Sequence, residues 1–248
     1  FLLASSEDLR LMLPFYSDND CIIYEGDCMS IIPLLPTGGF ESFDLLFLDP
    51  PFQIYKDLEK ELFPVTKTVV AFSNAANVHY LYEMFGKPRF ELIWKMGNGN
   101  ARWTTHYGPL TVHENILVWG ETGEAYVGEY NTDFTPRKLR SNIGSGDDRL
   151  DGFKIYTPRE RKLIYSVLDF PQDGGNASNG MGRMGKPLKL MELLLEWINP
   201  ETILDPFMGS GTTLEAGRNL KMHTIAIEKE LEYCEIAKQR LAQQRLPI

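Results

Sequence analysis

The stretch FDLLFLDPPFQIY, residues 43 to 55, decides how the chain is organised. Five of the six residues from Phe43 to Leu48 are apolar, which is typical of a strand buried on both faces. The strand ends on Asp49, and two prolines that stiffen the turn precede Phe52. One interpretation is a plain turn in which Asp49 caps and Phe52 fills the core. The other is a functional site, because ligands of α/β proteins bind at the carboxyl ends of strands.

The rest of the N-terminal half alternates between strand-like and helix-like segments. A helix is predicted over residues 74–86, between two of the apolar runs. Strands are predicted in CIIYEGD (21–27), LLFLDPP (45–51), KTVVAFS (67–73), FELIWK (90–95) and ENILVWG (114–120). This alternation predicts a largely parallel sheet with helices on both faces.

The C-terminal half resumes this pattern around a glycine-rich turn. PLKLMELLLEWI (187–198) predicts a helix with Leu188, Met191, Leu195 and Ile198 on one stripe. TILDPFMGSGTTLEAG (202–217) then predicts a strand that ends at Asp205, a turn with Gly209 and Gly211, and a new helix. Such glycines let the backbone approach a ligand, and the helix start offers free N–H groups. The alternative is a tight strand-to-helix turn with no ligand.

An acid ends the next predicted strand, HTIAIE (223–228). Glu228 lies 23 residues beyond Asp205, a spacing that suits acceptance of hydrogen bonds from ribose hydroxyls. The alternative is a solvated charge at the start of the following helix. The pairing with the glycine-rich turn favours the ribose interpretation.

Composition excludes several classes of protein. The chain of 248 residues has three scattered cysteines and four histidines without metal-type spacing, so we expect no disulfide framework and no metal site. No apolar stretch approaches a membrane span and no signal peptide is evident, so we expect a cytoplasmic protein with no membrane contact. The net charge of −9 argues mildly against a general nucleic-acid binder.

Residues 121–182 break the pattern and predict an irregular insertion. They are rich in Gly, Asp, Asn, Pro and basic residues, with little periodicity. Residues 137–162 contain eight basic residues and only four acids, so this acidic protein has one locally positive segment. We expect Arg137, Lys138, Arg140 and Arg159 to contact nucleic-acid phosphates or bases. An ordinary solvated loop is the alternative.

Asp49-Pro50-Pro51-Phe52 resembles the catalytic motif of amino-directed methyltransferases, which use S-adenosylmethionine. The exocyclic amine of adenine or cytosine is a poor nucleophile, because its lone pair is delocalised into the ring. The Asp49 carboxylate and the Pro50 carbonyl can accept the two amino hydrogens and so free that lone pair. Phe52 can stack on a base that has left its helix. Asp49, Pro50, Pro51 and Phe52 are therefore the predicted catalytic residues.

The order of the motifs resembles the β class of DNA amino-methyltransferases, whose halves are circularly permuted. Here the tetrapeptide precedes the glycine-rich turn, and the resemblance covers most of the chain. It implies one Rossmann-like α/β domain over 1–248 with a mostly parallel, seven-stranded type of sheet. Its parts would be a catalytic half (19–120), a target-recognition insertion (121–182) and a cofactor half (183–248). The implied cofactor-binding residues are Asp27, Lys186, Asp205, Pro206, Phe207, Gly209, Ser210, Gly211, Thr212 and Glu228.

The resemblance implies site-specific methylation of DNA, as in restriction–modification, and a homodimer. Asp at the start of the tetrapeptide favours N6 of a flipped adenine over N4 of cytosine. Methylation of adenine in RNA and an inactive nucleic-acid-binding partner subunit are the alternatives within this family. A nucleotide-binding regulator that binds ATP through the glycine-rich turn is the alternative outside it.

Overall fold

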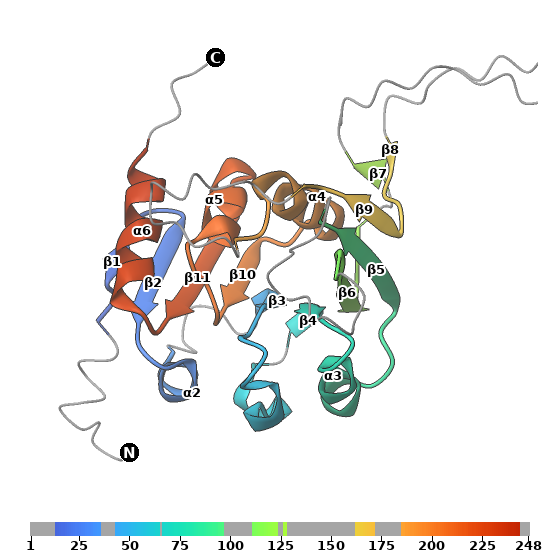
Figure 1. The fold of residues 1–248 in the computed structure, drawn as a ribbon. Coiled ribbons are helices and arrows are strands. Elements are labelled where there is room, and N and C mark those ends of the chain that lie inside the picture. The colour runs from blue at the N-terminus through green and yellow to red at the C-terminus, as the bar shows by residue number, and fades with distance from the viewer. Residues whose placement is uncertain are drawn as a thin grey trace, which may run out of the picture.

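The fold is built on a mixed sheet that has the strand before Asp49 near its centre (Figure 1). The structure, a computed structural model, describes residues 13–35, 43–64, 66–96, 111–123, 126–127, 162–171 and 185–243. Within these residues the sheet has nine strands in the order β1-β2-β11-β10-β3-β4-β6-β5-β9. The strands are β1 Tyr16–Ser17, β2 Cys21–Glu25, β3 Phe43–Leu48, β4 Thr66–Ser73, β5 Phe90–Lys95, β6 His113–Gly120, β9 Val167–Asp169, β10 Thr202–Asp205 and β11 His223–Glu228.

Most neighbouring strands of this sheet run parallel, as the sequence predicts. The pairs from β2 through β11, β10 and β3 to β4 are all parallel, and so is β5 with β9. Strand β6 is antiparallel to both β4 and β5, and β1 is antiparallel to β2. Seven longer strands therefore form the sheet, and two strands of two or three residues extend its edges. A separate antiparallel pair joins β7 Tyr126–Val127 to β8 Lys162–Leu163.

Helices cover both faces of the sheet, which confirms the predicted α/β class. Figure 1 shows α4, α5 and α6 on one face, and α2 and α3 on the other. Their bounds are α2 Cys28–Ile31, α3 Val78–Phe85, α4 Leu188–Ile198, α5 Thr212–Asn219 and α6 Leu231–Ala242. Single 3₁₀ turns lie at η1 Ile32–Leu34, η2 Tyr55–Asp57 and η3 Lys60–Leu62. Helix α3 begins later than predicted because the Asn74 side chain accepts from the Ala76 and Asn77 N–H groups and forms a turn first.

Strand β3 is buried because both faces of the sheet are covered at its position. Leu45 and Phe47 pack into the core that includes α4, whereas Leu46 and Leu48 pack into the core on the opposite face. The one polar residue, Asp44, lies at the start of the strand. Its carboxylate accepts from the backbone N–H groups of Glu201 and Thr202 at 2.8 and 3.1 Å, and it pairs with Lys67. Asp44 therefore aligns β3 with β10 at the end of the strand that is remote from Asp49.

Helix α4 is buried over more of its circumference than one stripe. The predicted residues Met191, Leu195 and Ile198 are buried, but Leu190, Leu193, Leu194 and Trp197 are buried as well. The buried Glu192 accepts from Asn219 Nδ2 at 2.7 Å, which links α4 to the end of α5. The helix ends at Ile198, and the next residue, Asn199, has a left-handed φ of 54° and donates its N–H to the Leu195 carbonyl at 2.7 Å.

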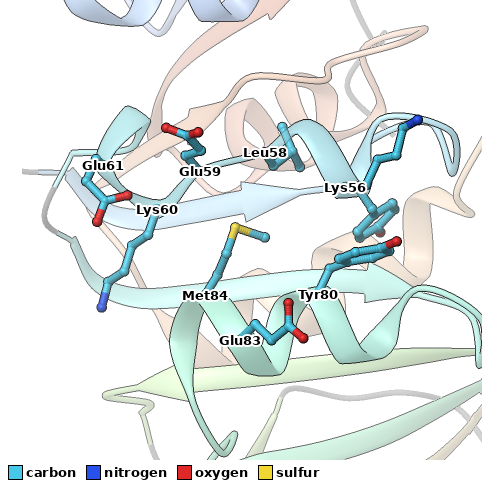
Figure 2. Close-up of a pocket in the computed structure, with 9 residues that line it drawn as sticks. Lys56, Leu58, Glu59, Lys60, Glu61, Tyr80, Glu83 and Met84 are labelled. Atoms are coloured by element: carbon cyan, nitrogen blue, oxygen red, sulfur yellow. The ribbon is translucent and has the colours of Figure 1, made fainter.

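A hollow of about 350 Å³ lies between η2, η3 and α3 (Figure 2). Its lining residues are Tyr55, Lys56, Leu58, Glu59, Lys60, Glu61, Tyr80, Glu83 and Met84. Three of them are acidic and two are lysines, and only Tyr55 belongs to the surroundings of Asp49. The hollow is therefore separate from the strand ends that carry the predicted site residues.

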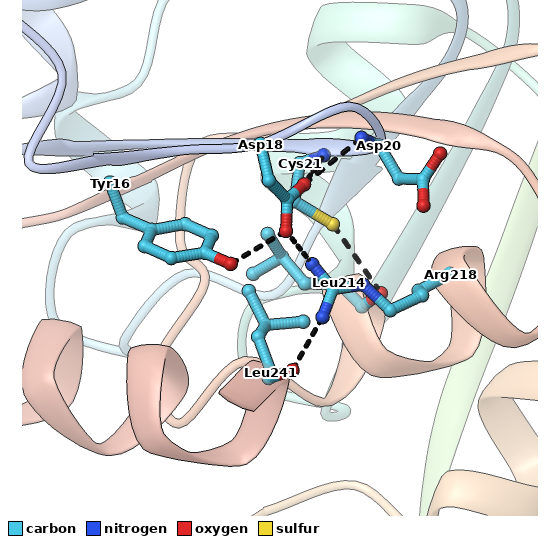
Figure 3. Close-up of polar contacts among 7 residues, drawn as sticks. All are labelled: Tyr16, Asp18, Asp20, Cys21, Leu214, Arg218 and Leu241. Atoms are coloured by element: carbon cyan, nitrogen blue, oxygen red, sulfur yellow. Dashed lines mark hydrogen bonds and ion pairs between the residues drawn. The ribbon is translucent and has the colours of Figure 1, made fainter. Parts of the chain in front are cut away.

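A polar clamp fastens the first hairpin to the C-terminal helices (Figure 3). Asp18, between β1 and β2, accepts from the Tyr16 hydroxyl at 2.6 Å and pairs with Arg218 of α5. Arg218 also donates to the Leu241 carbonyl of α6 at 2.6 Å. This clamp holds β1, α5 and α6 together at one edge of the sheet. Over the described ranges, the helices are all too short or too polar for a membrane-spanning segment.

Candidate active site

The carboxyl ends of four parallel strands bring the predicted acids to one edge of the sheet. Asp49 follows β3, Asp205 ends β10, Glu228 ends β11, and Asp27 lies two residues beyond β2. The register aligns Asp205 with Ala226 and Glu228 with Glu25, so neighbouring strands end at similar heights. Parallel strands place such ends together by geometry. The structure thus brings together residues that are up to 201 positions apart in the chain, as the sequence predicts.

Asp49 is held by a lysine from the other half of the chain. Lys186 Nζ lies 2.8 Å from Asp49 Oδ1 and 2.7 Å from Oδ2, so one ammonium contacts both carboxylate oxygens. The same Nζ lies 3.2 Å from Glu114 Oε2 at the start of β6. Lys186 was expected at the cofactor on the strength of the resemblance. The structure places its ammonium at Asp49, and its part in cofactor binding stays a prediction.

The aromatic residue of the tetrapeptide points outward at the same loop. Phe52 is 39% exposed, which is unusual for a phenylalanine, and its carbonyl accepts from Asn77 Nδ2 at 2.9 Å. Its ring stacks near that of Tyr55, with the centroids 6.4 Å apart. Tyr55 is buried and donates its hydroxyl to the Phe72 carbonyl of β4. A buried ring therefore supports an exposed one, which leaves the Phe52 face available to a ligand.

The glycine-rich turn has the backbone geometry that its sequence predicts. Gly209 and Gly211 have φ of 54° and 82°, values that other residues rarely adopt. A Cβ on Gly211 would lie 2.7 Å from Ala237 Cβ of α6, whereas a Cβ on Gly209 would meet nothing within 4 Å. Gly211 is therefore needed for packing. Gly209 borders open space.

Glu228 and Asp27 both contact backbone at the ends of their strands. Glu228 accepts from the Gly209 N–H at 2.8 Å through Oε2 and from the Glu230 N–H at 2.9 Å through Oε1. It thus ties the end of β11 to the glycine-rich turn, and each oxygen keeps a lone pair for a further donor. Asp27 caps α2 by accepting from Met29 N–H at 2.9 Å, and Lys229 lies 3.3 Å away.

The other predicted cofactor residues line the same turn. Pro206 is buried and Phe207 is half-buried, and the Phe207 N–H donates to Asp205 Oδ1 at 3.0 Å. Ser210 lies beside the segment that carries Lys186, since a Cβ on Gly185 would be 3.6 Å from Ser210 Oγ. The Thr212 hydroxyl accepts from Arg240 at 2.9 Å, which engages it with α6. The turn and the Lys186 segment therefore form one continuous wall.

Asp205 is an acid with an unusual titration. Its side chain is 1% exposed, and burial raises its pKa to about 7. Hydrogen bonds from Thr213 and from the Phe207 N–H oppose this rise, whereas the charges of Asp49 and Glu228 add to it. A cation bound beside Asp205 would favour the ionised carboxylate.

Asp205 gives a prediction for the pH dependence of stability. The pKa of Asp205 is raised in the folded state. Its contribution to the free energy of unfolding is therefore full below about pH 4 and is lost as the pH rises through about 7. We expect the wild-type free energy of unfolding to fall, relative to that of Asp205→Asn, by up to about 4 kcal/mol between pH 4 and pH 8. Urea unfolding of both proteins across this range measures the difference. A constant difference would contradict the assignment.

Several predicted residues lie outside the part of the chain that the structure describes. These are Arg137, Lys138, Arg140 and Arg159, together with most of the insertion 121–182. Sequence reasoning missed the link between Glu114 and Asp49, because nothing in a single sequence pairs a residue of β6 with the loop after β3. Among the described residues, no cluster of His, Cys, Asp and Glu could hold a metal ion, and none was expected.

The fold and the site together define a class of protein. A covered, mostly parallel sheet places an Asp-Pro-Pro-Phe loop and a cofactor-type glycine turn at one edge, which is the arrangement of an amino-directed methyltransferase. Comparison with known proteins then gives the family. Residues 73–239 match the family model N6_N4_Mtase, described as DNA methylase. The chain belongs to this family, and it is a DNA methyltransferase of the type that modifies N6 of adenine or N4 of cytosine.

Individual relatives agree with this assignment. The chain is 47% identical to the type II methyltransferase M2.MboI of Moraxella bovis over 94% of its own length and 92% of that protein. Among solved structures, it is similar to the cytosine-N4-specific PvuII DNA methyltransferase, with a TM-score of 0.61, 14% identity and coverage of 94% and 90%. It is also similar to the M1.HpyAVI–SAM complex, with a TM-score of 0.58, 22% identity and coverage of 89% and 99%. These structures confirm the predicted Rossmann-like fold.

Proposed function

We propose that this protein transfers a methyl group from S-adenosylmethionine to N6 of an adenine flipped out of DNA, at a specific site, as the modification enzyme of a restriction–modification system. The observation that supports this proposal most directly is the environment of the Asp49 carboxylate. Its carboxylate is aimed by the buried Lys186 and lies at the same sheet edge as the glycine-rich turn. The name of the relative M2.MboI, a type II methyltransferase, supports the restriction–modification setting.

The acceptors of the tetrapeptide act on the target amine. Asp49 and the Pro50 carbonyl accept its two hydrogens, which pulls the nitrogen towards a tetrahedral geometry and frees its lone pair. Pro50 is buried and Pro51 is exposed, and proline holds this short array rigid. Little reorganisation is then needed during the reaction, so the contribution of these residues is orientation and electrostatics.

The exposed ring of Phe52 supports binding of a base outside its helix. Stacking on an aromatic side chain is worth about 1–3 kcal/mol per base, which offsets part of the energy of unstacking. The support that Tyr55 gives from below keeps the ring in place, because Tyr55 is itself anchored to β4. We propose that the flipped base lies between Phe52 and the Asp49 acceptors.

The cofactor residues fit S-adenosylmethionine. When bound, this cofactor supplies an electrophilic methyl group on a positively charged sulfur. We assign the ribose to Glu228, the adenine to Asp27, and the methionine part to the turn of Asp205, Gly209 and Gly211. The open space beside Gly209 and the acidic surroundings of Asp205 support this assignment. Pro206, Phe207, Ser210, Thr212 and Lys186 would complete the wall of the cofactor site.

The remaining parts of the proposal concern DNA and the organisation of the chain. We propose that 121–182 recognises the target, with Arg137, Lys138, Arg140 and Arg159 at the DNA. The parts 19–120 and 183–248 would be the catalytic and cofactor halves of one permuted domain, active as a homodimer. The pairing of β10 and β11 between β2 and β3 supports joint action of the two halves.

The experiment that tests this function is methylation of mixed-sequence DNA and of RNA with labelled S-adenosylmethionine, followed by nucleoside analysis. We expect N6-methyladenine from DNA, confined to one sequence context. Detection of N4-methylcytosine would show that the target base is cytosine rather than adenine. Label found in RNA alone would show that the substrate is RNA rather than DNA. The absence of any incorporation, with ATP bound instead of S-adenosylmethionine, would contradict the proposal.

A further inference from the structure

Three charged side chains from separate elements meet at residues 49–52, which follow β3 and are called the acceptor loop below. Asp49 follows β3, Glu114 lies in β6, and Lys186 precedes α4. Lys186 Nζ is within 2.8 Å of both Asp49 oxygens and 3.2 Å from Glu114 Oε2. One ammonium thus bridges two carboxylates. Of these three side chains, the reaction described above uses Asp49 as an acceptor and Lys186 to aim it, and it assigns no part to Glu114.

Lys186 is fixed on its apolar side as well. Its Nζ lies 4.7 Å from the centre of the Phe72 ring and 5.6 Å from that of Trp94, and both rings are buried. Burial by itself would lower the pKa of Lys186, but the Asp49 and Glu114 carboxylates outweigh burial and raise it. The ammonium therefore stays charged and has little freedom to turn.

Glu114 is poorly satisfied for a buried acid. Its side chain is only 16% exposed, and its Oε2 has an ion pair to Lys186 but no hydrogen bond of good geometry among the described residues. Burial raises the pKa of Glu114, Lys186 lowers it, and Asp49 raises it further. A buried carboxylate in this condition contributes little to stability. A functional role therefore explains the presence of Glu114 better than a role in stability.

The charges of the cluster do not cancel. Two carboxylates and one ammonium leave one net negative charge at the acceptor loop. Besides Asp49 and Lys186, the titratable group that faces Glu114 within the described ranges is Tyr55, whose pKa burial raises, so that it stays neutral. Without Glu114, the pair of Asp49 and Lys186 would be neutral.

We propose that Glu114 is a positioning residue of the methyl transfer, which acts through Lys186 to aim Asp49 and to leave one negative charge at the target amine. The inference rests on the proposed function, because it needs a positive charge to arrive at the amino nitrogen. As the N–C bond forms and the S–C bond breaks, the positive charge moves from the sulfur to the nitrogen, and a nearby anion stabilises it. The neutral thioether leaves, and the methylated amine, now acidic, releases one proton to solvent. A neutral pair of Asp49 and Lys186 would aim the acceptor but would itself add no negative charge, and stabilisation would be left to carboxylates outside the cluster, such as Asp205.

The test compares Glu114→Gln with Glu114→Asp and with the control Asp169→Asn. The control removes the carboxylate of another Lys–Asp pair, Lys95 and Asp169, which spans β5 and β9 at 2.6 Å and is exposed. For each protein, single-turnover methylation of DNA is measured from pH 5 to pH 9. Binding of S-adenosylmethionine by calorimetry and thermal unfolding are measured on the same samples.

We expect Glu114→Gln to slow single-turnover methylation by about 100-fold at pH 8, the scale on which small misplacements of catalytic groups act. It should bind S-adenosylmethionine within about threefold of wild type and unfold at a similar temperature. The wild-type rate should fall at acid pH partly because Glu114 takes up a proton, and Glu114→Gln should lose that part of the fall. The part that Asp205 contributes, with its pKa of about 7, should remain in both proteins. Glu114→Asp should recover part of the rate and keep the acid limb. Asp169→Asn should match wild type.

Two results would overturn the inference. One is a Glu114→Gln protein with the wild-type rate and an unchanged acid limb. The other is a loss of rate that follows a loss of folded protein in both Glu114 variants, since a structural role explains that. Failure of the proposed function looks different, because wild type itself would then incorporate no methyl group into DNA.

Discussion

Replacing Asp49 with asparagine is expected to slow methyl transfer by about 10²- to 10³-fold or more, the usual effect of removing one charged partner of a reacting group. The amide is neutral, and it leaves the buried Lys186 with Glu114 as its remaining carboxylate. Acceptance of the amino hydrogen is then weaker, and the aim of the side chain is lost. Single-turnover methylation of DNA at saturating cofactor measures the effect, and cofactor binding should change by no more than a few-fold.

Asp44→Asn is the matched control for this prediction, because it changes an aspartate at the other end of the same strand. Asp44 holds the start of β10 and pairs with Lys67, and these contacts lower its pKa against the effect of burial. Its loss should lower stability by about 1–3 kcal/mol and leave the rate per folded molecule unchanged. An Asp49→Asn protein with full activity would remove the proposed mechanism.

Replacing Glu228 with alanine is expected to weaken cofactor binding by about 10- to 100-fold, the equivalent of one or two charge-assisted hydrogen bonds. Two effects add in this variant. The ribose loses its acceptor, and the Gly209 N–H loses the carboxylate that fixes the glycine-rich turn. Calorimetry with S-adenosylmethionine measures the cofactor affinity. DNA affinity, measured by fluorescence anisotropy, should change by no more than about twofold.

The control for Glu228 is Glu232→Ala, which removes an exposed carboxylate from the first turn of α6. It changes the net charge equally but contacts none of the site residues described above. We expect cofactor affinity close to that of wild type. Equal losses of cofactor and DNA affinity in Glu228→Ala would contradict the ribose assignment, because they would indicate a general structural defect.

Local sequence patterns predicted those parts of the fold that depend on nearby residues. The apolar run of β3, the glycines with positive φ and the acid at the end of β11 each follow from a short stretch of chain. The burial of Leu193 and Leu194 in α4 was not predicted, because it depends on what packs around the helix. A stripe in a sequence reports one face, whereas tertiary neighbours decide how many faces are covered.

The candidate site divides in the same way. The strand-end acids were predicted, because parallel strands bring their carboxyl ends together whatever the details of the loops. The contact of Lys186 with Asp49 joins residues 137 positions apart, and Glu114 reaches the same ammonium from a third segment. No local pattern specifies such a meeting. The strand order brings these three residues together, and that order could not be derived from local patterns in one sequence.

The insertion of β10 and β11 between β2 and β3 has a consequence for how the protein is made. The centre of the sheet joins residues near position 45 to residues near position 203, so its completion waits until the later segment has left the ribosome. Pairing between residues so far apart in the chain is slow, because the entropy of loop closure is lost before any stabilising contact forms. The acceptor loop is thus synthesised early and gains its lysine late. A nascent or truncated chain therefore holds the tetrapeptide Asp49–Phe52 without the lysine that contacts Asp49.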